Sequence, residues 1–284
     1  MSTEKNYDDI ITKHYKKIAE QEGDKSTSTM VDVITREKET RVIVDFVGDS
    51  LRNRKAENNQ DSALIMDIGC GNGYTLEVLA NQYPKEKFIG VEKTKELREL
   101  AISRFENMEN VSIMEGDIRN SNFAKGKIAD ILICQRVIIN LLNENDQKQA
   151  LKNIASVVIK PHTWQSGGTL LFLESFSSSL SKLNEAREEF DLPAIKQAHH
   201  NLYLQDNFFD IPELKKVITD GCIAPQNFLS THYYVTRVLH PIFIKDRPIK
   251  RNSEFVNFFT QTLQETDGDY SPLKLYIFER ITNK

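Results

Sequence analysis

Short apolar runs alternate with helical patterns through the middle of the chain. Runs rich in Val, Ile, Leu and Phe predict strands at residues 63–68, 88–91, 111–114, 129–134 and 169–174. Apolar residues spaced three and four apart predict helices between them, at residues 74–83, 94–105 and 144–159. Such alternation predicts an α/β fold with a doubly wound, mostly parallel sheet. Two later runs, at residues 233–239 and 274–280, predict a sixth and a seventh strand that complete a seven-stranded sheet.

Two further helical patterns precede the first strand. They cover residues 6–20 and 31–54, and a polar stretch rich in Ser and Thr separates them. We expect residues 1–60 to form a helical segment that lies over the sheet edge as a lid, with Tyr15 facing a ligand. Simple packing is the alternative role for these helices. Residues 61–284 then form the main domain, which includes an insertion at residues 176–232 before the sixth strand.

The junction between the first strand and its helix is rich in glycine. It reads Asp67-x-Gly69-x-Gly71-x-Gly73, and such a turn lets a ligand approach bare backbone at the carboxyl edge of a parallel sheet. A dinucleotide-binding turn reads G-x-G-x-x-G and faces a pyrophosphate. An acid ahead of the first glycine would repel a pyrophosphate, whereas it suits a cationic amino-acid ligand. A dehydrogenase of the Rossmann type is the structural alternative.

Acidic residues also end the second and third predicted strands. Glu92 follows the glycine turn by about 20 residues, where a carboxylate can accept hydrogen bonds from both ribose hydroxyls. Asp117 can accept from the exocyclic amine of adenine, and Ile118 can pack on the ring. Each residue alone can be an ordinary solvated turn residue, but three successive strand ends agree on an adenosine ligand.

At these positions the chain resembles the class I S-adenosylmethionine-dependent methyltransferases. The matching residues are Asp67 to Gly73, Glu92, Gly116 to Ile118, Ala129 to Leu142 and Gly168, so the resemblance covers about residues 60–175. It implies a Rossmann-like methyltransferase fold with S-adenosylmethionine as the cofactor.

The resemblance also assigns roles to individual residues. Asp67 and the glycine turn would line the methionine moiety, Glu92 would hold the ribose, and Asp117 and Ile118 would contact adenine. Cys134 and Gln135, at the end of the fourth strand, would lie beside the cofactor and face the substrate. Methyltransferases of nucleic-acid amines often carry Asn/Asp-Pro-Pro-aromatic at that place, and its absence here argues against methylation of a base nitrogen.

The predicted insertion carries the candidates for the acceptor side. His200 can act as a general base, because its unperturbed pKa lies near neutrality. Tyr203 and Arg136 complete the catalytic candidates; Tyr15, Asn140 and Asn201 are the candidates for substrate binding. The alternative for each is a polar loop residue whose hydrogen bonds are satisfied. His14 is expected to be an exposed helical residue, and His199, His232 and His240 are expected to have no role in the site.

Residues 135–142, 183–187 and 200–203 resemble methyltransferases encoded with bacterial surface-sugar biosynthesis. This narrower resemblance implies O-methylation of a sugar or related small polar metabolite. N-methylation of an amino sugar or small amine stays open, as does a protein that binds the cofactor without catalysis.

The composition limits which class of protein this is and where it is located. The chain has 284 residues, of which 39% are hydrophobic and 27% charged, as in globular proteins. Its net charge of -4 gives no general attraction for nucleic acid or an anionic membrane. No apolar run approaches the ~20 residues of a membrane span, and residues 1–7 lack the apolar core of a secretion signal. Cys70, Cys134 and Cys222 show no metal-ligand spacing. We therefore expect a cytoplasmic enzyme with a small-molecule substrate and no metal, and we leave a homo-oligomer open.

Overall fold

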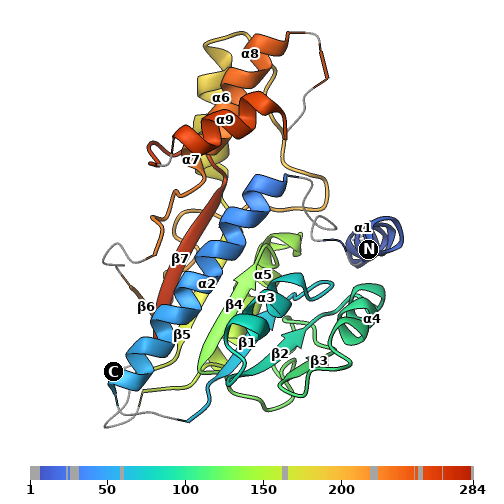
Figure 1. The fold of residues 1–284 in the computed structure, drawn as a ribbon, viewed down its shortest axis with the longest axis vertical. Helices are drawn as coiled ribbons and strands as arrows, with labels where there is room; N and C mark the ends of the chain where they lie inside the picture. Colours follow the sequence, from blue (N-terminus) through green and yellow to red (C-terminus); the bar gives the residue numbers. More distant parts are fainter. Residues whose placement is uncertain are drawn as a thin grey trace.

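The computed structural model describes residues 7–23, 25, 32–57, 61–161, 166–217, 223–245, 247–248, 252–263 and 265–282. Its seven-stranded sheet has the order β3-β2-β1-β4-β5-β7-β6 (Figure 1). The strands are β1 Leu64–Ile68, β2 Lys87–Val91, β3 Val111–Met114, β4 Ile131–Gln135, β5 Thr169–Ser175, β6 Leu214–Lys216 and β7 Leu273–Arg280. β1 to β5 are parallel, whereas β7 runs antiparallel to both β5 and β6. The predicted seven-stranded, mostly parallel fold is confirmed.

The helices follow the predicted alternation in the first two thirds of the chain. They are α1 Asp8–Glu22, α2 Val33–Ala56, α3 Tyr74–Gln82, α4 Lys95–Arg104, α5 Glu144–Ser156, α6 Ser177–Glu188, α7 Ser230–Tyr234, α8 His240–Ile244 and α9 Glu254–Thr262. A short 3₁₀ turn, η1, covers Ile138–Asn140, and a π-helical turn, η2, covers Val235–Leu239. No helix within the described ranges has both the length and the apolar character that crossing a membrane requires.

Two apolar cores lie on the two faces of the sheet. Successive residues of β4 alternate between them: Ile131 and Ile133 face α2 and α3, while Leu132 and Cys134 face α5. Because both faces are covered, the parallel strands read as nearly continuous apolar runs, which is why the sequence reveals them so clearly.

The two N-terminal helices have different positions. α2 packs along one face of the sheet, and its buried Ile43, Phe46 and Val47 belong to the core there. α1 instead lies beside α4, near the carboxyl ends of the parallel strands (Figure 1). α2 therefore does not act as the expected lid, because too much of its apolar face is packed on the sheet. The Ser/Thr stretch at residues 26–30 lies outside the described residues.

The predicted sixth strand at residues 233–239 is wrong, because this segment is helical. Aromatic and β-branched residues favoured a strand, but Tyr233 and Val238 pack on α6 around Leu183 and Ala186. Tertiary packing on α6 thus overrides the local strand preference. The sixth strand is instead the short β6, so a second insertion follows between β6 and β7. In Figure 1, α6 to α9 gather beyond the ends of β5 and β7.

Candidate functional site

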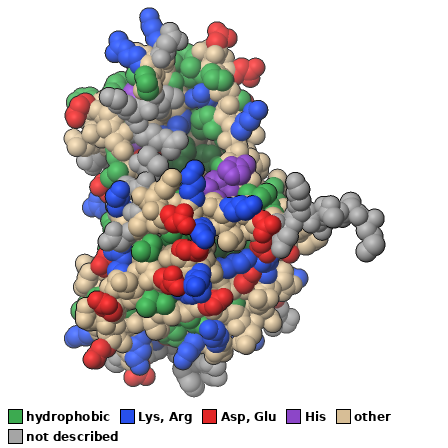
Figure 2. Space-filling model, turned by 90° about the vertical axis from the view of Figure 1, so that its right-hand side faces the viewer, with side chains coloured by type: hydrophobic (Ala, Val, Ile, Leu, Met, Phe, Trp, Pro, Cys, Tyr) green, Lys and Arg blue, Asp and Glu red, His purple; other side chains and the backbone are tan. Residues whose placement is uncertain are grey.

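A cavity of about 460 Å³ lies at the carboxyl edge of the parallel strands. Figure 2 shows a hollow on the face that α1 borders. The predicted site residues that line the cavity are Tyr15, Asp67, Gly69, Gly71, Glu92, Asp117, Ile118, Gln135, Arg136, Asn140, His200, Asn201 and Tyr203. Gly73 and Cys134 are absent from its lining. The structure thus brings together residues from α1, the strand ends and the insertion.

The three turn glycines have positive φ angles but different surroundings. Gly69 has φ +66°, and a Cβ there would lie 2.5 Å from a methyl group of Val137. Gly71 has φ +57°, and a Cβ there would meet no atom of the described residues within 4 Å, so its open side can face a ligand. A Cβ on Gly73 would lie 2.6 Å from the ring of Phe105. Gly73 therefore serves the packing at the start of α3 rather than the cavity.

Glu92 braces the glycine turn from the neighbouring strand. Its carboxylate accepts hydrogen bonds from the backbone N–H of Gly71 at 3.0 Å and from that of Thr94 at 2.7 Å. Burial raises the pKa of Glu92, and these backbone donors partly oppose that rise. A carboxylate offers about four lone-pair sites, and the Thr94 side chain is a third donor to Glu92, so capacity is left for a ribose hydroxyl.

Asp67 is a buried carboxyl group that faces the cavity. It is only 3% exposed, and within the described part of the chain no residue donates a hydrogen bond to its side chain. Burial raises the pKa of Asp67 to about 7, an effect that the Arg36 guanidinium opposes and Glu92 reinforces. A buried carboxyl group of this kind is stabilised by a cationic ligand.

Arg36 on α2 is a cavity residue that sequence reasoning missed. It is buried, and burial lowers its pKa to about 10, so it remains charged at neutral pH. Asp67 and Arg36 together offer one anion and one cation to the same end of the cavity. This pair matches the ammonium and carboxylate groups of an amino acid.

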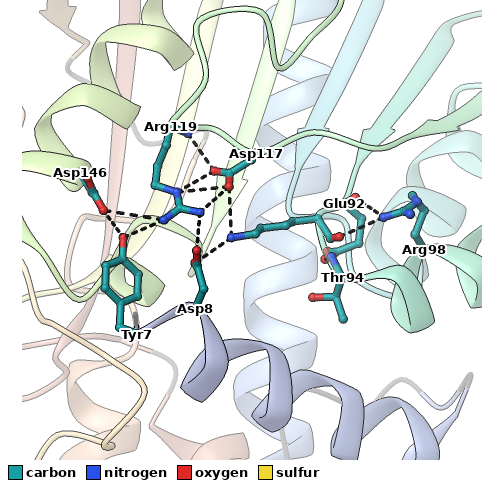
Figure 3. A network of polar contacts seen from close by, with 9 residues as sticks. Tyr7, Asp8, Glu92, Thr94, Arg98, Asp117, Arg119 and Asp146 are labelled. Atoms are coloured by element: carbon teal, nitrogen blue, oxygen red, sulfur yellow. Dashed lines mark hydrogen bonds and ion pairs between the residues drawn. The ribbon is translucent and has the colours of Figure 1, made fainter. Parts of the chain in front are cut away.

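Asp117 belongs to an ion-pair network that reaches α1 (Figure 3). Its carboxylate lies 2.6 Å from Arg119 and 3.1 Å from Lys93, and Asp8 of α1 contacts both of these cations. Burial acts to raise the pKa of Asp117, but the contacts with Arg119 and Lys93 hold that pKa well below its usual range. In the predicted contact with adenine, Asp117 would therefore bind the adenine while it also contacts these two cations. Ile118 is buried beside it.

The last residue of β4 and the residue after it are connected to α2. Gln135 donates its amide N–H to the fully buried Glu39 at 2.6 Å, and Arg136 lies 3.5 Å from the same carboxylate. Arg136 has φ +55°, a conformation that costs a non-glycine residue free energy and often occurs at functional sites. Sequence reasoning missed Glu39, because only the packing of α2 on the sheet determines which of its polar residues turn inward.

Cys134 lies on the other face of β4. Its Sγ donates to Glu174 at 3.7 Å, and the Glu174 carboxylate accepts from the backbone N–H groups of Val137 at 2.9 Å and Ile138 at 2.8 Å. Burial raises the pKa of Glu174 to about 7. Cys134 and Glu174 thus shape the turn that carries Arg136, and the structure places the Cys134 thiol outside the cavity.

Backbone hydrogen bonds anchor the segment that carries the acceptor-side residues. Leu202 N–H donates to Ile139 O at 2.7 Å, and Leu204 N–H donates to Ser175 O at 2.9 Å. His200 and Tyr203 therefore project from a segment fixed to η1 and β5. Burial raises the pKa values of Tyr15 and Tyr203 to about 12, so both phenols stay protonated as hydrogen-bond donors.

His200 has an unusual setting. Its ring stacks on His14 with centroids 3.6 Å apart and planes inclined by 21°. Its Nδ1 is buried and has no hydrogen-bond partner among the described residues. Burial lowers the pKa of His200 to about 4, with smaller contributions from His14 and His199. His200 is therefore a neutral imidazole at pH 7.

The other histidines partly depart from expectation. His14 is half-buried in the cavity wall rather than exposed on a helix surface. His199 lies next to it, with its ring centroid 5.1 Å from that of His200. His232 and His240 are buried away from the cavity lining, where His232 contacts Asp32 at 3.4 Å.

Comparisons with known proteins find methyltransferases. Residues 65–161 match the family model described as a methyltransferase domain. Malonyl-[acyl-carrier protein] O-methyltransferase of Bacillus anthracis is 25% identical over 185 residues, which span 64% of this chain and 64% of that protein. The match thus covers less than two thirds of the curated relative.

Two solved structures share the fold over nearly the whole chain. Magnesium protoporphyrin IX methyltransferase from Synechocystis, with bound S-adenosylmethionine, gives a TM-score of 0.55 at 12% identity and covers 99% of this chain and 100% of that chain. The N-methyltransferase NodS from Bradyrhizobium japonicum, in complex with S-adenosyl-L-homocysteine, gives a TM-score of 0.50 at 12% identity, with coverages of 95% and 98%. Residues 65–161 thus match a methyltransferase domain, and the chain as a whole has the fold of these two S-adenosylmethionine-dependent methyltransferases.

Proposed function

We propose that the protein transfers the methyl group of S-adenosylmethionine to a hydroxyl oxygen of a small polar acceptor, a sugar or a related metabolite. The observation that carries this proposal is the position of His200. Its neutral imidazole lines the same cavity as the glycine turn, Asp67 and Glu92. One cavity therefore offers both a place for the donor and a group that can take the proton of a hydroxyl.

The donor half fits the residues at the strand ends. Asp67 would hold the ammonium group of the methionine moiety, and Arg36 would hold its carboxylate. Glu92 would accept from the ribose hydroxyls, while Asp117 and Ile118 would meet the adenine. When bound, S-adenosylmethionine supplies an electrophilic methyl group next to a positive sulfur. The buried Asp67 carboxyl group also favours that positive charge.

The acceptor half is rich in groups that hydrogen-bond to hydroxyls. Arg136 and Asn140 line the cavity from the segment after β4, and Asn201 and Tyr203 line it from the insertion. Tyr15 joins them from α1. Such a wall can align an acceptor hydroxyl with the methyl carbon and sulfur, which is the main task of the protein in a transfer of this kind.

The low pKa of His200 is compatible with its role. An alcohol is a weak nucleophile, but its proton becomes strongly acidic as the new carbon–oxygen bond forms. An imidazole can therefore accept this proton late in the reaction even when its pKa is about 4. The same low pKa keeps the imidazole unprotonated at neutral pH. Tyr203 would donate a hydrogen bond to the acceptor rather than act as a base, because burial raises its pKa.

N-methylation of an amino sugar or small amine is the alternative chemistry. An amine loses its proton more readily than an alcohol does, so it needs the base less. The two reactions therefore predict different consequences for removal of the His200 imidazole.

The His200→Ala variant tests the proposal on the acceptor that the protein methylates. We expect kcat to fall by roughly 10²-fold while the Kd for S-adenosylmethionine changes little. Added imidazole should restore part of the lost rate, which a purely structural role would not allow. An unchanged kcat would remove His200 from the mechanism and favour an amine acceptor.

A further inference from the structure

His14, His199 and His200 form a compact cluster at the rim of the cavity. One ring nitrogen from each residue can be chosen so that all three lie within 4.8 Å of one another. The three rings are in mutual contact range, with centroid separations of 3.6, 5.1 and 6.1 Å. Figure 2 shows histidine side chains gathered beside the hollow.

The three residues come from two parts of the molecule. His199 and His200 belong to the segment that backbone hydrogen bonds attach to η1 and β5. His14 belongs to α1, which ion pairs connect to the body of the domain, among them Lys16 to Glu96 at 3.5 Å and the partly buried pair of Asp8 and Arg119 at 3.0 Å. The cluster thus joins α1 to a segment that is distant in sequence.

The chemistry of the cluster suits one class of ion. Imidazole nitrogens are preferred ligands of Zn²⁺ and related transition metals, whereas Mg²⁺ and Ca²⁺ prefer oxygen. Tetrahedral Zn²⁺ with Zn–N bonds of about 2.0–2.1 Å requires nitrogens about 3.3 Å apart, so the cluster must contract by ~1.5 Å. The stacked rings of His14 and His200 must also turn away from each other so that their in-plane lone pairs converge on the ion. Burial lowers the pKa values of both His14 and His200, and metal binding requires such unprotonated imidazoles.

We propose that His14, His199 and His200 bind a zinc-class divalent cation that fixes α1 across the mouth of the cavity and switches the enzyme off. The fourth ligand is a water molecule or a group of the acceptor. A neutral imidazole has a single basic lone pair, so a His200 ring bound to the cation cannot accept a proton. The inhibitory part rests on the proposed function, whereas the binding site itself does not.

Lys17 is the opposing charge next to the cluster. It lowers the pKa of His14 as a minor contribution after burial and His199, and it would repel a bound cation as well. Removal of this charge therefore gives a variant that should gain affinity. A gain is informative because a misfolded protein cannot produce it.

Calorimetric titration with Zn²⁺, without cofactor or acceptor, tests the site. The wild-type protein should bind one Zn²⁺, and the His14→Ala and His199→Ala variants should each bind it at least about tenfold more weakly. The Lys13→Ala variant, altered at an exposed position of the same helix, should match the wild type. Lys17→Ala should bind about twofold more tightly. Equal affinity in the wild type and both histidine variants would overturn the site.

Methyl-transfer assays then test the inhibition. Each protein is compared with its own rate in chelator, so that any basal defect cancels. Zn²⁺ should lower the wild-type rate by at least about tenfold and leave the relative rate of His199→Ala nearly unchanged. Zn²⁺ binding without inhibition would retain the metal site but refute the switch. Absence of any methyl transfer in chelator would instead contradict the proposed function and leave the binding result standing.

Discussion

The carboxylate of Glu92 accepts a hydrogen bond from the backbone N–H of Gly71 at 3.0 Å. Glu92, at the end of β2, thereby fixes the shape of the glycine turn that follows β1. The same carboxylate has lone pairs left for a ribose, so one buried side chain both shapes the turn and would contact the cofactor.

Replacement of Glu92 by Gln should weaken S-adenosylmethionine binding by about 10- to 100-fold. The amide keeps one acceptor oxygen but loses the charge, and hydrogen bonds to a charged group contribute about 1.5–3 kcal/mol. Equilibrium binding measurements on both proteins give the ratio. The matched control is Glu99→Gln, at an exposed position on α4, which should bind like the wild type. Equal affinity of the Glu92 and Glu99 variants would remove Glu92 from the site.

A pair of glycine substitutions separates backbone strain from ligand binding. Gly69 and Gly126 have positive φ angles of +66° and +76°, but a Cβ would meet Val137 only at Gly69. Each Gly→Ala change should cost about 1–2 kcal/mol of unfolding free energy for the strained backbone. Gly69→Ala should also lose cofactor affinity, whereas Gly126→Ala should retain it. Denaturant unfolding and cofactor titration measure the two effects, and normal affinity of Gly69→Ala would argue against this turn as the binding loop.

Arg36 should discriminate between ligands with and without a methionine moiety. Arg36→Gln removes the proposed partner of the methionine carboxylate, so affinity for S-adenosylhomocysteine should fall by at least about tenfold. Affinity for adenosine, which lacks that carboxylate, should change little. Arg41→Gln, at an exposed position on the same helix, is the control. A parallel loss of adenosine affinity would show that Arg36 supports the fold of the site instead.

The affinity for S-adenosylmethionine should fall as pH drops below about 7. Burial raises the pKa of Asp67 to about 7 in the empty cavity, while a bound ammonium group favours its ionised form. Below that pKa, binding must release a proton, so affinity should decline towards tenfold per pH unit; above it, Asp67 contributes no slope. Arg36 stays charged throughout, and protonation of the neighbouring Glu92 would add to the loss.

Calorimetry across pH 5.5 to 8.5 measures this slope. The Asp67→Asn variant, which cannot ionise, should show a clearly flatter profile than the wild type. Identical slopes in the two proteins would assign the proton to another group.

The part of the site built from strand ends was predictable from sequence. Asp67, Glu92 and Asp117 each follow a buried apolar run, and parallel strands bring their carboxyl ends to one edge. The apolar run and the acidic residue that follows it are visible in the local sequence, and the parallel topology brings the three acidic residues together. Gly73 shows the limit of this reasoning, because its spacing fits the turn while its role is packing against Phe105.

The contributions of the helices were not predictable in the same way. Arg36 and Glu39 reach the site because α2 docks with that face inward, and only the packed sheet selects the face. The wrong strand at residues 233–239 has a similar origin, since α6 supplies the surface that holds this segment as a helix. His14 joins His199 and His200 only through the position of α1. These features depend on tertiary contacts between distant segments, which a periodic pattern does not contain.

The most direct test of the central claim is transfer of an isotope-labelled methyl group. The purified protein is incubated with methyl-labelled S-adenosylmethionine and a panel of sugars, nucleotide sugars and their amino counterparts, and each product is analysed by fragmentation mass spectrometry. The account predicts one labelled methyl group on an oxygen of a hydroxyl-bearing acceptor. Label on nitrogen would contradict the proposed acceptor, and cofactor binding without transfer to any member of the panel would contradict the proposed activity.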